Sequence, residues 1–381
     1  MMHYLFSILV VLFIGGLFYY VFFLDGVVIS YDRYDQADTE AAAETNEVAL
    51  PKHVVPPTPV RAIYMTSWVG GTKDWRAELV QFVERTELNA IVIDIKDYSG
   101  MVSFITGDEV IKRIGSEEER ISDMQAFIHE LHSKNIYVIA RITAFQDPHY
   151  SKLFPDDAIK DSRGGLWKDK NGLTYVDPLA RDFWDYLVRV ARAAEAVGFD
   201  ELNFDYIRYP SDGPIQYAVY PYTKNGIAKA DVIEEFFQYI NHELDSVPVP
   251  LSADLFGFTT YYENDLNIGQ ILERADPYFD YLSPMVYPSH YPDGFNGYAN
   301  PAKHPYDIIR LSMTRGMERL MNASSTPEKL RPWIQDFDLG ATYDEYMVRE
   351  EKRAVYDVGL DSWMAWDPAN RYTRSAYDPA N

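Results

Sequence analysis

A regular alternation of apolar runs and amphipathic stretches between 60 and 367 constrains the fold of this chain most strongly. The eight strand-like runs lie at 60–68, 90–97, 136–145, 199–209, 249–257, 279–288, 330–337 and 360–367. The seven helical stretches between them lie at 75–87, 121–135, 180–198, 231–245, 268–275, 306–320 and 343–359. This rhythm predicts a (β/α)8 TIM barrel, an α/β fold. An open doubly wound sheet is the alternative, but it normally uses fewer strands, and no Gly-x-Gly-x-x-Gly turn follows the first run.

Two segments of different composition precede the barrel pattern. Residues 4–24 are almost uninterrupted apolar and aromatic residues, enough for a helix across a hydrocarbon core roughly 30 Å thick. We predict an uncleaved transmembrane anchor at 1–29. A cleavable signal peptide is the alternative, but its apolar run is usually shorter, and no small-x-small cleavage site follows closely. Residues 30–59 are rich in Asp, Glu, Ala, Thr and Pro and predict an acidic tether. The barrel at 60–381 is then expected outside the cytoplasm, on a single-pass anchor in the cell membrane.

Composition narrows the classes of partner. The net charge of −23 repels phosphate backbones, so nucleic acid is not an expected partner. The chain has no cysteine, which excludes disulfides, a thiolate nucleophile and a Cys-ligated metal. The 30 Tyr, 20 Phe and 7 Trp residues suit stacking on sugar rings, although many of these rings are expected in the core.

Polar side chains recur where the predicted strands end, and the C-terminal ends of barrel strands face the active site. In the run 199–209, Asn203 and Asp205 point to one side, and Pro-Ser-Asp-Gly at 210–213 closes the segment. In the run 90–97, alternating isoleucines face the helices, which predicts Asp94 and Lys96 inside the barrel mouth. The other runs place further candidates at this mouth: Arg141, Asp254, Tyr287, Asp336 and Trp366.

Asp205 and Asp254 form the candidate catalytic pair. Glycoside hydrolysis needs one protonated and one ionised carboxyl group. The two residues end adjacent strands about 4.8 Å apart, which suits the carboxyl separation of roughly 5–5.5 Å in a retaining enzyme, while an inverting arrangement stays open. We assign Asp205 as the nucleophile, kept ionised by Arg208. We assign Asp254 as the acid/base, with Phe256 and Phe258 desolvating it and raising its pKa.

Other readings of these residues stay open. Asp94, Lys96 and Arg141 can also form a buried charge network that only fills the barrel mouth. The acidic cluster can hold a divalent cation, but the chain has no His-x-His or His-Glu-x-x-His spacing, so no metal or other cofactor is predicted. The three histidines of the loops are expected to face solvent, and no Gly-x-Ser-x-Gly motif indicates a serine nucleophile.

Two insertions interrupt the rhythm. The segment 146–178 contains Pro, Gly-Gly and Asn-Gly signals and predicts a long loop over the C-terminal face of the barrel. Trp167 and Tyr175 are its predicted substrate contacts, or else these rings only pack the loop against itself. The segment 98–119 predicts a hairpin after the second strand.

Three motifs carry a resemblance to a known family. Residues 203–210 read Asn-Phe-Asp-Tyr-Ile-Arg-Tyr-Pro, residues 90–97 read Ala-Ile-Val-Ile-Asp-Ile-Lys-Asp, and residues 331–337 read Arg-Pro-Trp-Ile-Gln-Asp-Phe. Over roughly 60–367 the chain resembles a bacterial glycoside hydrolase family of exported TIM-barrel proteins, itself similar to the α-amylase-like superfamily. The resemblance implies a barrel, a carbohydrate substrate and a nucleophile at the fourth strand, here Asp205. In α-amylase relatives the acid/base is a Glu that ends the fifth strand, where this chain has Asp254.

The sequence therefore predicts a membrane-anchored hydrolase of glycosidic bonds in a polysaccharide. Four aromatic residues are expected to stack on sugar rings: Trp68, Trp167, Tyr287 and Trp366. Polar residues are expected to bind hydroxyls or tune the carboxylates: Asp94, Lys96, Arg141, Asn203, Arg208 and Asp336. The alternatives are a catalytically silent glycan-binding barrel and a metal-dependent polysaccharide hydrolase or deacetylase.

Overall fold

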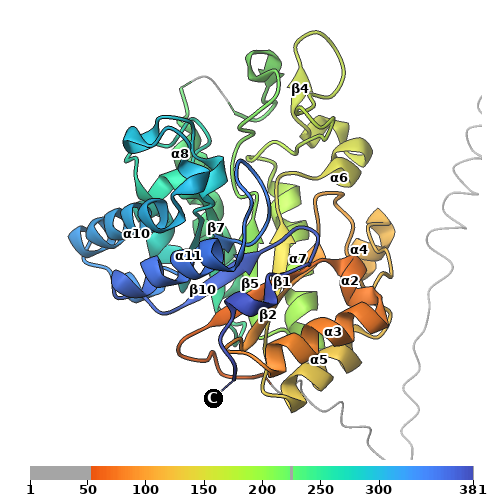
Figure 1. Ribbon diagram of the computed structural model, residues 1–381. Coiled ribbons are helices and arrows are strands. Elements are labelled where there is room, and N and C mark those ends of the chain that lie inside the picture. The colour runs from red at the N-terminus through yellow and green to blue at the C-terminus, as the bar shows by residue number, and fades with distance from the viewer. Residues whose placement is uncertain (1–52, 224–225, 381) are drawn as a thin grey trace, which may run out of the picture. The chain divides into compact units, whose positions relative to one another are not determined.

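The computed structural model describes residues 53–223 and 226–380. Eight parallel strands close into a barrel, and each strand pairs with the next barrel strand along the chain (Figure 1). The barrel strands are β1 (Arg61–Met65), β2 (Ala90–Lys96), β3 (Tyr137–Thr143), β5 (Glu201–Asp205), β7 (Leu251–Phe256), β8 (Tyr281–Met285), β9 (Trp333–Gln335) and β10 (Trp363–Trp366). Each lies inside one predicted run, so the predicted fold class is confirmed.

Seven helices follow the predicted helical stretches. They are α3 (Lys73–Glu84), α5 (Met124–Ser133), α7 (Arg181–Val197), α8 (Lys229–Leu244), α9 (Leu272–Ala275), α10 (Pro305–Asn322) and α11 (Glu345–Asp357). Helix α9 is shorter than predicted because Leu266, Asn267 and Gly269 have positive φ angles, which a helix cannot contain. Short helices α2 (Ser67–Gly71) and α4 (Glu109–Ile114) were not predicted.

The barrel wall separates two layers of side chains. Ile91 and Ile93 of β2 pack outward in the apolar layer beneath the helices. Ala90 and Val92 point inward and pack with Met364 of β10. Apolar residues of β1, β2 and β10 thus fill part of the interior, whereas β5 and β7 place polar residues inside. The alternation of side chains along each strand separates the inward layer from the outward layer.

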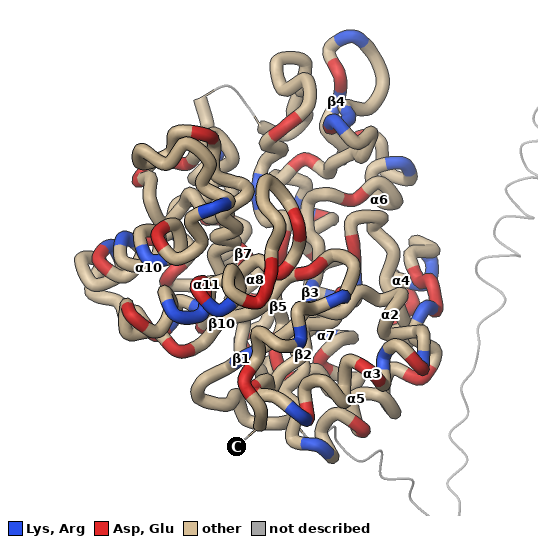
Figure 2. Tube along the Cα trace, viewed as in Figure 1, with Lys and Arg blue, Asp and Glu red and all other residues tan. Residues whose placement is uncertain are grey.

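A buried ion pair lies inside the barrel, and it differs from the exposed charges of the outer helices, which contribute little to stability. Acidic and basic residues are mixed along the outer helices α10 and α11 (Figure 2), and exposed pairs of this kind stabilise a fold by roughly 0–1 kcal/mol. Inside, Glu201 at the start of β5 pairs with Arg331, and it also accepts hydrogen bonds from Tyr137 Oη at 3.0 Å and Ser252 Oγ at 2.6 Å. These partners satisfy a carboxylate that burial would otherwise penalise.

Two long loops on the C-terminal face join each other. The loop after β3 carries α6 (Pro148–Leu153) and β4 (Lys160–Asp161), and the loop after β5 carries β6 (Ala218–Val219). Strands β4 and β6 pair antiparallel above the barrel (Figure 1). The loops also approach closely at Gly213, where φ is 78° and a Cβ would lie 2.9 Å from Asp169 Cα. The long loop predicted at 146–178 is thus present, tied to its neighbour.

The predicted hairpin at 98–119 is wrong. This stretch folds around α4, which Asp108 begins by accepting backbone hydrogen bonds from Val110 and Ile111, and which Gly115 ends with a φ of 69°. Capping at both ends favours the helix. Isolated bridges join Val102 to Lys96 of β2 and to Glu117 within the same stretch, and no paired strands form there.

The predicted anchor lies outside the described residues, as does the tether up to residue 52, so both remain predictions. No helix within 53–223 or 226–380 is long and apolar enough to cross a bilayer. The last tether residues contact the barrel domain, because the Val54 amide donates a hydrogen bond to Asp200 Oδ1 at 2.7 Å. His53 Nε2 lies 3.1 Å from Glu195 Oε1.

Candidate active site

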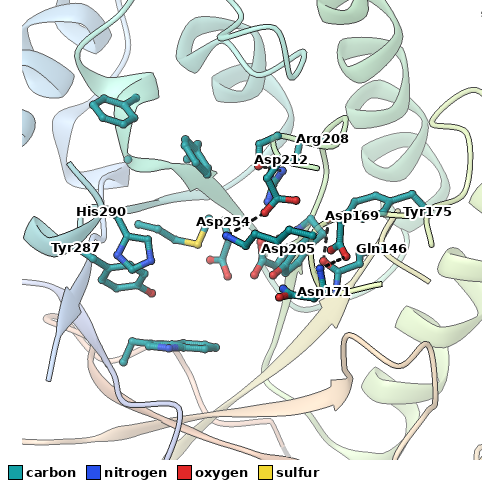
Figure 3. A pocket seen from close by; sticks show the side chains of 18 of the residues that line it. Gln146, Asp169, Asn171, Tyr175, Asp205, Arg208, Asp212, Asp254, Tyr287 and His290 are labelled. Carbon is teal, nitrogen blue, oxygen red and sulfur yellow. Dashed lines mark hydrogen bonds and ion pairs between the residues drawn. The ribbon is translucent and has the colours of Figure 1, made fainter. Parts of the chain in front are cut away.

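Asp205 and Asp254 lie at the same level inside the barrel. Asn203 of β5 is opposite Ser252 of β7 in the strand ladder, and each aspartate lies two residues further along its strand on the same inward face. Both line a cavity of about 380 Å³ at the C-terminal end of the barrel (Figure 3). This volume lies within the range of small-molecule sites. The structure therefore brings the two predicted carboxyl groups together.

The backbone fixes the position of Asp205. The residue ends β5, and Tyr206 follows with a positive φ of 53°, which stops the strand. The amide of Tyr206 donates a hydrogen bond to Asp205 Oδ1 at 2.5 Å. The carboxylate thus accepts a hydrogen bond from the turn that ends its own strand.

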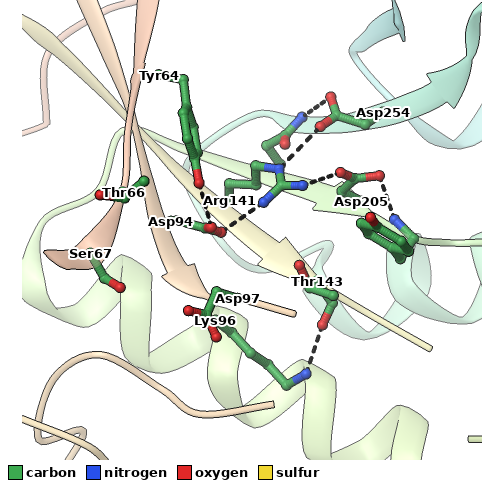
Figure 4. Close-up of polar contacts among 12 residues, drawn as sticks. Tyr64, Thr66, Ser67, Asp94, Lys96, Asp97, Arg141, Thr143, Asp205 and Asp254 are labelled. Carbon is green, nitrogen blue, oxygen red and sulfur yellow. Dashed lines mark hydrogen bonds and ion pairs between the residues drawn. The ribbon is translucent and has the colours of Figure 1, made fainter. Parts of the chain in front are cut away.

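Arg141 of β3 connects three carboxyl groups (Figure 4). Its Nη1 donates to Asp94 Oδ1 at 2.8 Å, its Nη2 pairs with Asp205, and its Nε lies 3.6 Å from Asp254 Oδ2. Arg141 is buried. The prediction that Arg208 is the cation beside Asp205 is wrong, because Arg141 occupies that place and Arg208 has no carboxylate within ion-pair distance among the described residues.

Asp254 has the environment of a proton donor. Its Oδ1 accepts hydrogen bonds from Trp333 Nε1 at 2.7 Å and Asn203 Nδ2 at 2.9 Å. Burial raises the pKa of Asp254 to about 8, the negative charge of Asp205 adds to this effect, and Arg141 opposes it. The sequence predicted a raised pKa from Phe256 and Phe258, but the main causes are the barrel interior and Asp205.

Asp94 and Asn203 lie below the cavity and do not line it. Asp94 accepts hydrogen bonds from Tyr64 Oη at 2.7 Å and from Arg141, and burial raises its pKa to about 6. Asn203 donates to Ser252 Oγ and Asp254. Both residues therefore position the groups that face the cavity, as the tuning part of their prediction expects.

The prediction that Lys96 faces the barrel mouth is wrong. The pairing of β2 with β3 shifts register between Asp94 and Lys96, and such a bulge turns the next side chain to the other face of the sheet. Lys96 Nζ lies 2.8 Å from Asp147 Oδ2, and both side chains are fully buried. Nζ also lies 5.6 Å from the ring centroid of Phe183 on α7. Lys96 thus supports the long loop from the outer side of the barrel.

Three further predicted contacts lie outside the cavity. Trp167 is fully buried in its loop and donates from Nε1 to Pro214 O at 3.0 Å. Trp68 is 57% exposed on α2 and lies 4.4 Å from the guanidinium of Arg120. Asp336 accepts hydrogen bonds from the segment 373–377, and burial raises its pKa to about 6. None of the three lines the cavity, so their predicted contact with substrate has no support there.

Loop residues complete the cavity around the predicted Tyr287, Trp366 and Arg208. The most informative of them are Gln146, Asp169, Lys170, Tyr175, Asp212 and His290. Lys170 Nζ pairs with Asp212 Oδ2 at 3.2 Å across the two joined loops. Tyr175 was predicted here, but His290 was expected in solvent. Burial and the charge of Lys170 lower the pKa of His290.

The described residues form no evident metal centre. Within 53–223 and 226–380, no group of three or more His, Asp or Glu side chains is arranged to hold an ion.

Comparison with known proteins identifies the family. A family model described as "putative glycosyl hydrolase domain" matches residues 62–372, which span the whole barrel. The chain belongs to this family. Membership in a glycosyl hydrolase family supports a hydrolase acting on carbohydrate in general. No curated protein sequence matches this chain significantly.

Solved structures share the barrel of this glycosyl hydrolase domain. The glycoside hydrolase domain of PgaB (BpsB) from Bordetella bronchiseptica has a TM-score of 0.58 at 12% identity, covering 85% of this chain and 100% of its own. A class V chitinase from Pseudomonas fluorescens has a TM-score of 0.51 at 11% identity, covering 84% and 98%. A hypothetical protein from Ruminiclostridium thermocellum is 35% identical, covering 50% of this chain and 96% of its own, with a TM-score of 0.46. The first two show a common fold.

Replacing Arg141 tests the three-carboxylate arrangement. Arg141→Met leaves three carboxyl groups in the barrel without their cation, and we expect a loss of roughly 3–5 kcal/mol in unfolding free energy at pH 8. Burial already raises the pKa values of Asp94 and Asp254, and losing the cation raises them further. The variant therefore loses more stability at a pH where these groups are ionised than at a pH where they are protonated. The loss should therefore be smaller at pH 5, as measured by urea denaturation.

Arg208→Met is the matched control, because Arg208 lines the same cavity without pairing with a carboxylate. Its effect on unfolding free energy should be the same at both pH values. An Arg141→Met loss that does not change with pH would contradict the charge balance inferred for Arg141.

Proposed function

We propose that this chain hydrolyses glycosidic bonds in a polysaccharide, with Asp205 as nucleophile and Asp254 as acid/base. One observation carries the proposal: two carboxyl groups at the same level of adjacent strands lie in different electrostatic environments. Asp205 has an ion pair and a backbone hydrogen bond, whereas the pKa of Asp254 is raised to about 8. A carboxyl group with a raised pKa suits the role of the acid, and a carboxylate held in an ion pair suits the role of the nucleophile.

The hydrogen bonds at Asp254 indicate which oxygen carries the proton. Oδ1 already accepts from Trp333 and Asn203, so Oδ2 is the oxygen that holds the proton in the neutral acid. Among the described residues no hydrogen bond involves Oδ2, and Arg141 Nε, 3.6 Å away, is a donor that cannot accept the proton. The proton on Oδ2 is therefore not committed to another acceptor and can pass to a glycosidic oxygen.

The reaction then follows the two steps of a retaining enzyme. Asp205 attacks the anomeric carbon as Asp254 transfers its proton to the leaving oxygen, which breaks the glycosidic bond. Asp254, now ionised, removes a proton from water, and the water oxygen displaces Asp205 from the sugar. In the inverting alternative, Asp205 activates the water directly. The anomer released first from the substrate distinguishes the two courses.

The setting of the domain favours a polymer as substrate. The cavity opens between two joined loops and offers Tyr287 and Trp366 as aromatic surface. The predicted anchor at 1–29 would hold the domain outside the cytoplasm, close to polysaccharides of the cell envelope. The alternative is a silent barrel that binds a glycan without hydrolysing it, in which the two acids are not catalytic.

Asp205→Asn tests the nucleophile. We expect at least about a 100-fold lower rate of reducing-sugar release from whichever polysaccharide the wild type cleaves, because the amide cannot attack the anomeric carbon. The measurement is a panel of bacterial and plant polysaccharides. Asp336→Asn is the control, a buried carboxyl group outside the cavity, and should retain activity. A wild type that binds a glycan without cleaving it would instead support the silent barrel.

The pH profile tests Asp254. The acid must be protonated in the free enzyme, so kcat/KM should be highest below pH 8 and should fall as pH rises through about 8. Asp254→Asn should abolish this alkaline limb from the residual activity. An alkaline limb that is identical in Asp254→Asn would remove Asp254 from the role of proton donor.

A further inference from the structure

Arg208 is an exception among the buried arginines of the described residues. Arg76, Arg141, Arg319 and Arg331 are also at least nine-tenths buried, and each pairs with a carboxylate. Arg208 is 8% exposed and has no carboxylate within ion-pair distance in 53–223 and 226–380. Burying an unpaired charge is costly, so binding of a ligand that supplies a counter-ion would be favoured at this site.

The hydrogen bonds of Arg208 leave part of its guanidinium free. Nη1 donates to Tyr209 O at 3.2 Å and to Ser211 Oγ at 3.0 Å. Nε is buried and has no partner within the described chain. These bonds fix the plane of the group, and Nη2, which makes no hydrogen bond within the described residues, remains to donate to a carboxylate of a ligand.

The site of Arg208 belongs to the cavity of the catalytic pair. Its guanidinium lies 5.0 Å from the ring centroid of Tyr206 and 5.3 Å from that of Phe256. Tyr206 follows Asp205 in sequence, and Phe256 lies two residues after Asp254. Figure 3 shows Arg208 in the same cavity as both aspartates, beside Asp212. Asp212 is already paired with Lys170.

We infer that Arg208 binds the carboxylate of an acidic sugar in the substrate, such as a uronic acid. The inference rests on the proposed function and adds the substrate class. A carboxylate fits better than a phosphate, because Asp169, Asp205 and Asp212 line the same cavity and would repel a dianion more strongly. A carboxylate also gains charge-assisted hydrogen bonds from Nη2 of the guanidinium.

The test measures the binding of sugars to the full-length protein by calorimetric titration. It compares sugars that differ only at C6. The probes are D-glucuronate, D-galacturonate, their neutral counterparts glucose and galactose, and glucose 6-phosphate. We expect at least one uronate to bind about tenfold more tightly than its neutral counterpart and than glucose 6-phosphate. Arg208→Met should remove this preference, while Arg208→Lys, which keeps the charge, should retain part of it.

Arg353→Met is the matched control, because Arg353 is exposed on α11 and pairs with Glu350 away from the cavity. It should leave the preference unchanged. The inference is overturned if neither uronate binds saturably, if neutral sugars bind as tightly, if the phosphate binds best, or if Arg208→Met keeps the preference. Binding is measured without turnover, so this result is independent of whether Asp205→Asn abolishes hydrolysis.

Discussion

The ion pairs of Arg141 are the interaction on which the site depends. One guanidinium at the centre of the barrel faces carboxyl groups from β2, β5 and β7. A single positive charge cannot neutralise three buried negative charges, so at least one carboxyl group favours its protonated form. The raised pKa values of Asp94 and Asp254 follow from this imbalance together with burial. The barrel thus places a carboxyl group with a raised pKa beside an ion-paired carboxylate, because its buried acids outnumber the cation among them.

The strand pattern explains how this arrangement arises. Asn203 and Ser252 are opposite one another in the ladder, which brings the next inward residues, Asp205 and Asp254, to one level. Trp333 reaches Asp254 from β9 and donates a hydrogen bond to Oδ1. The alternation of side chains along β5 and β7 therefore points both Asp205 and Asp254 into the barrel.

Much of the fold was predictable because its signals are local. Each strand is a short apolar run and each helix an amphipathic stretch, so the rhythm of the chain gives the barrel without any long-range contact. The same logic places the strand-end residues Asp205, Asp254, Arg141 and Tyr287 in one cavity. The predictions that failed concern contacts between residues that are distant in sequence. Lys96 is turned outward by a bulge that only the register with β3 reveals.

The remaining failures have the same origin. Arg208 is near Asp205 in sequence, but the residue that forms an ion pair with Asp205 is Arg141 on the neighbouring strand. Trp167 is a residue type that often stacks on sugars, yet its indole is buried and donates a hydrogen bond to the other long loop. His290 follows β8 and lines the same cavity as Lys170 of the long loop after β3. Loop packing of this kind has no sequence period from which to predict it.

The protonation of Asp254 is the central claim, and carbon NMR of aspartate-labelled protein measures it directly. We predict a carboxyl resonance, absent from Asp254→Asn, that titrates near pH 8 and titrates at lower pH in Asp205→Asn, because the neighbouring negative charge is lost. A resonance of Asp254 that titrates near the ordinary aspartate value of about 4 would contradict the assignment of Asp254 as the acid.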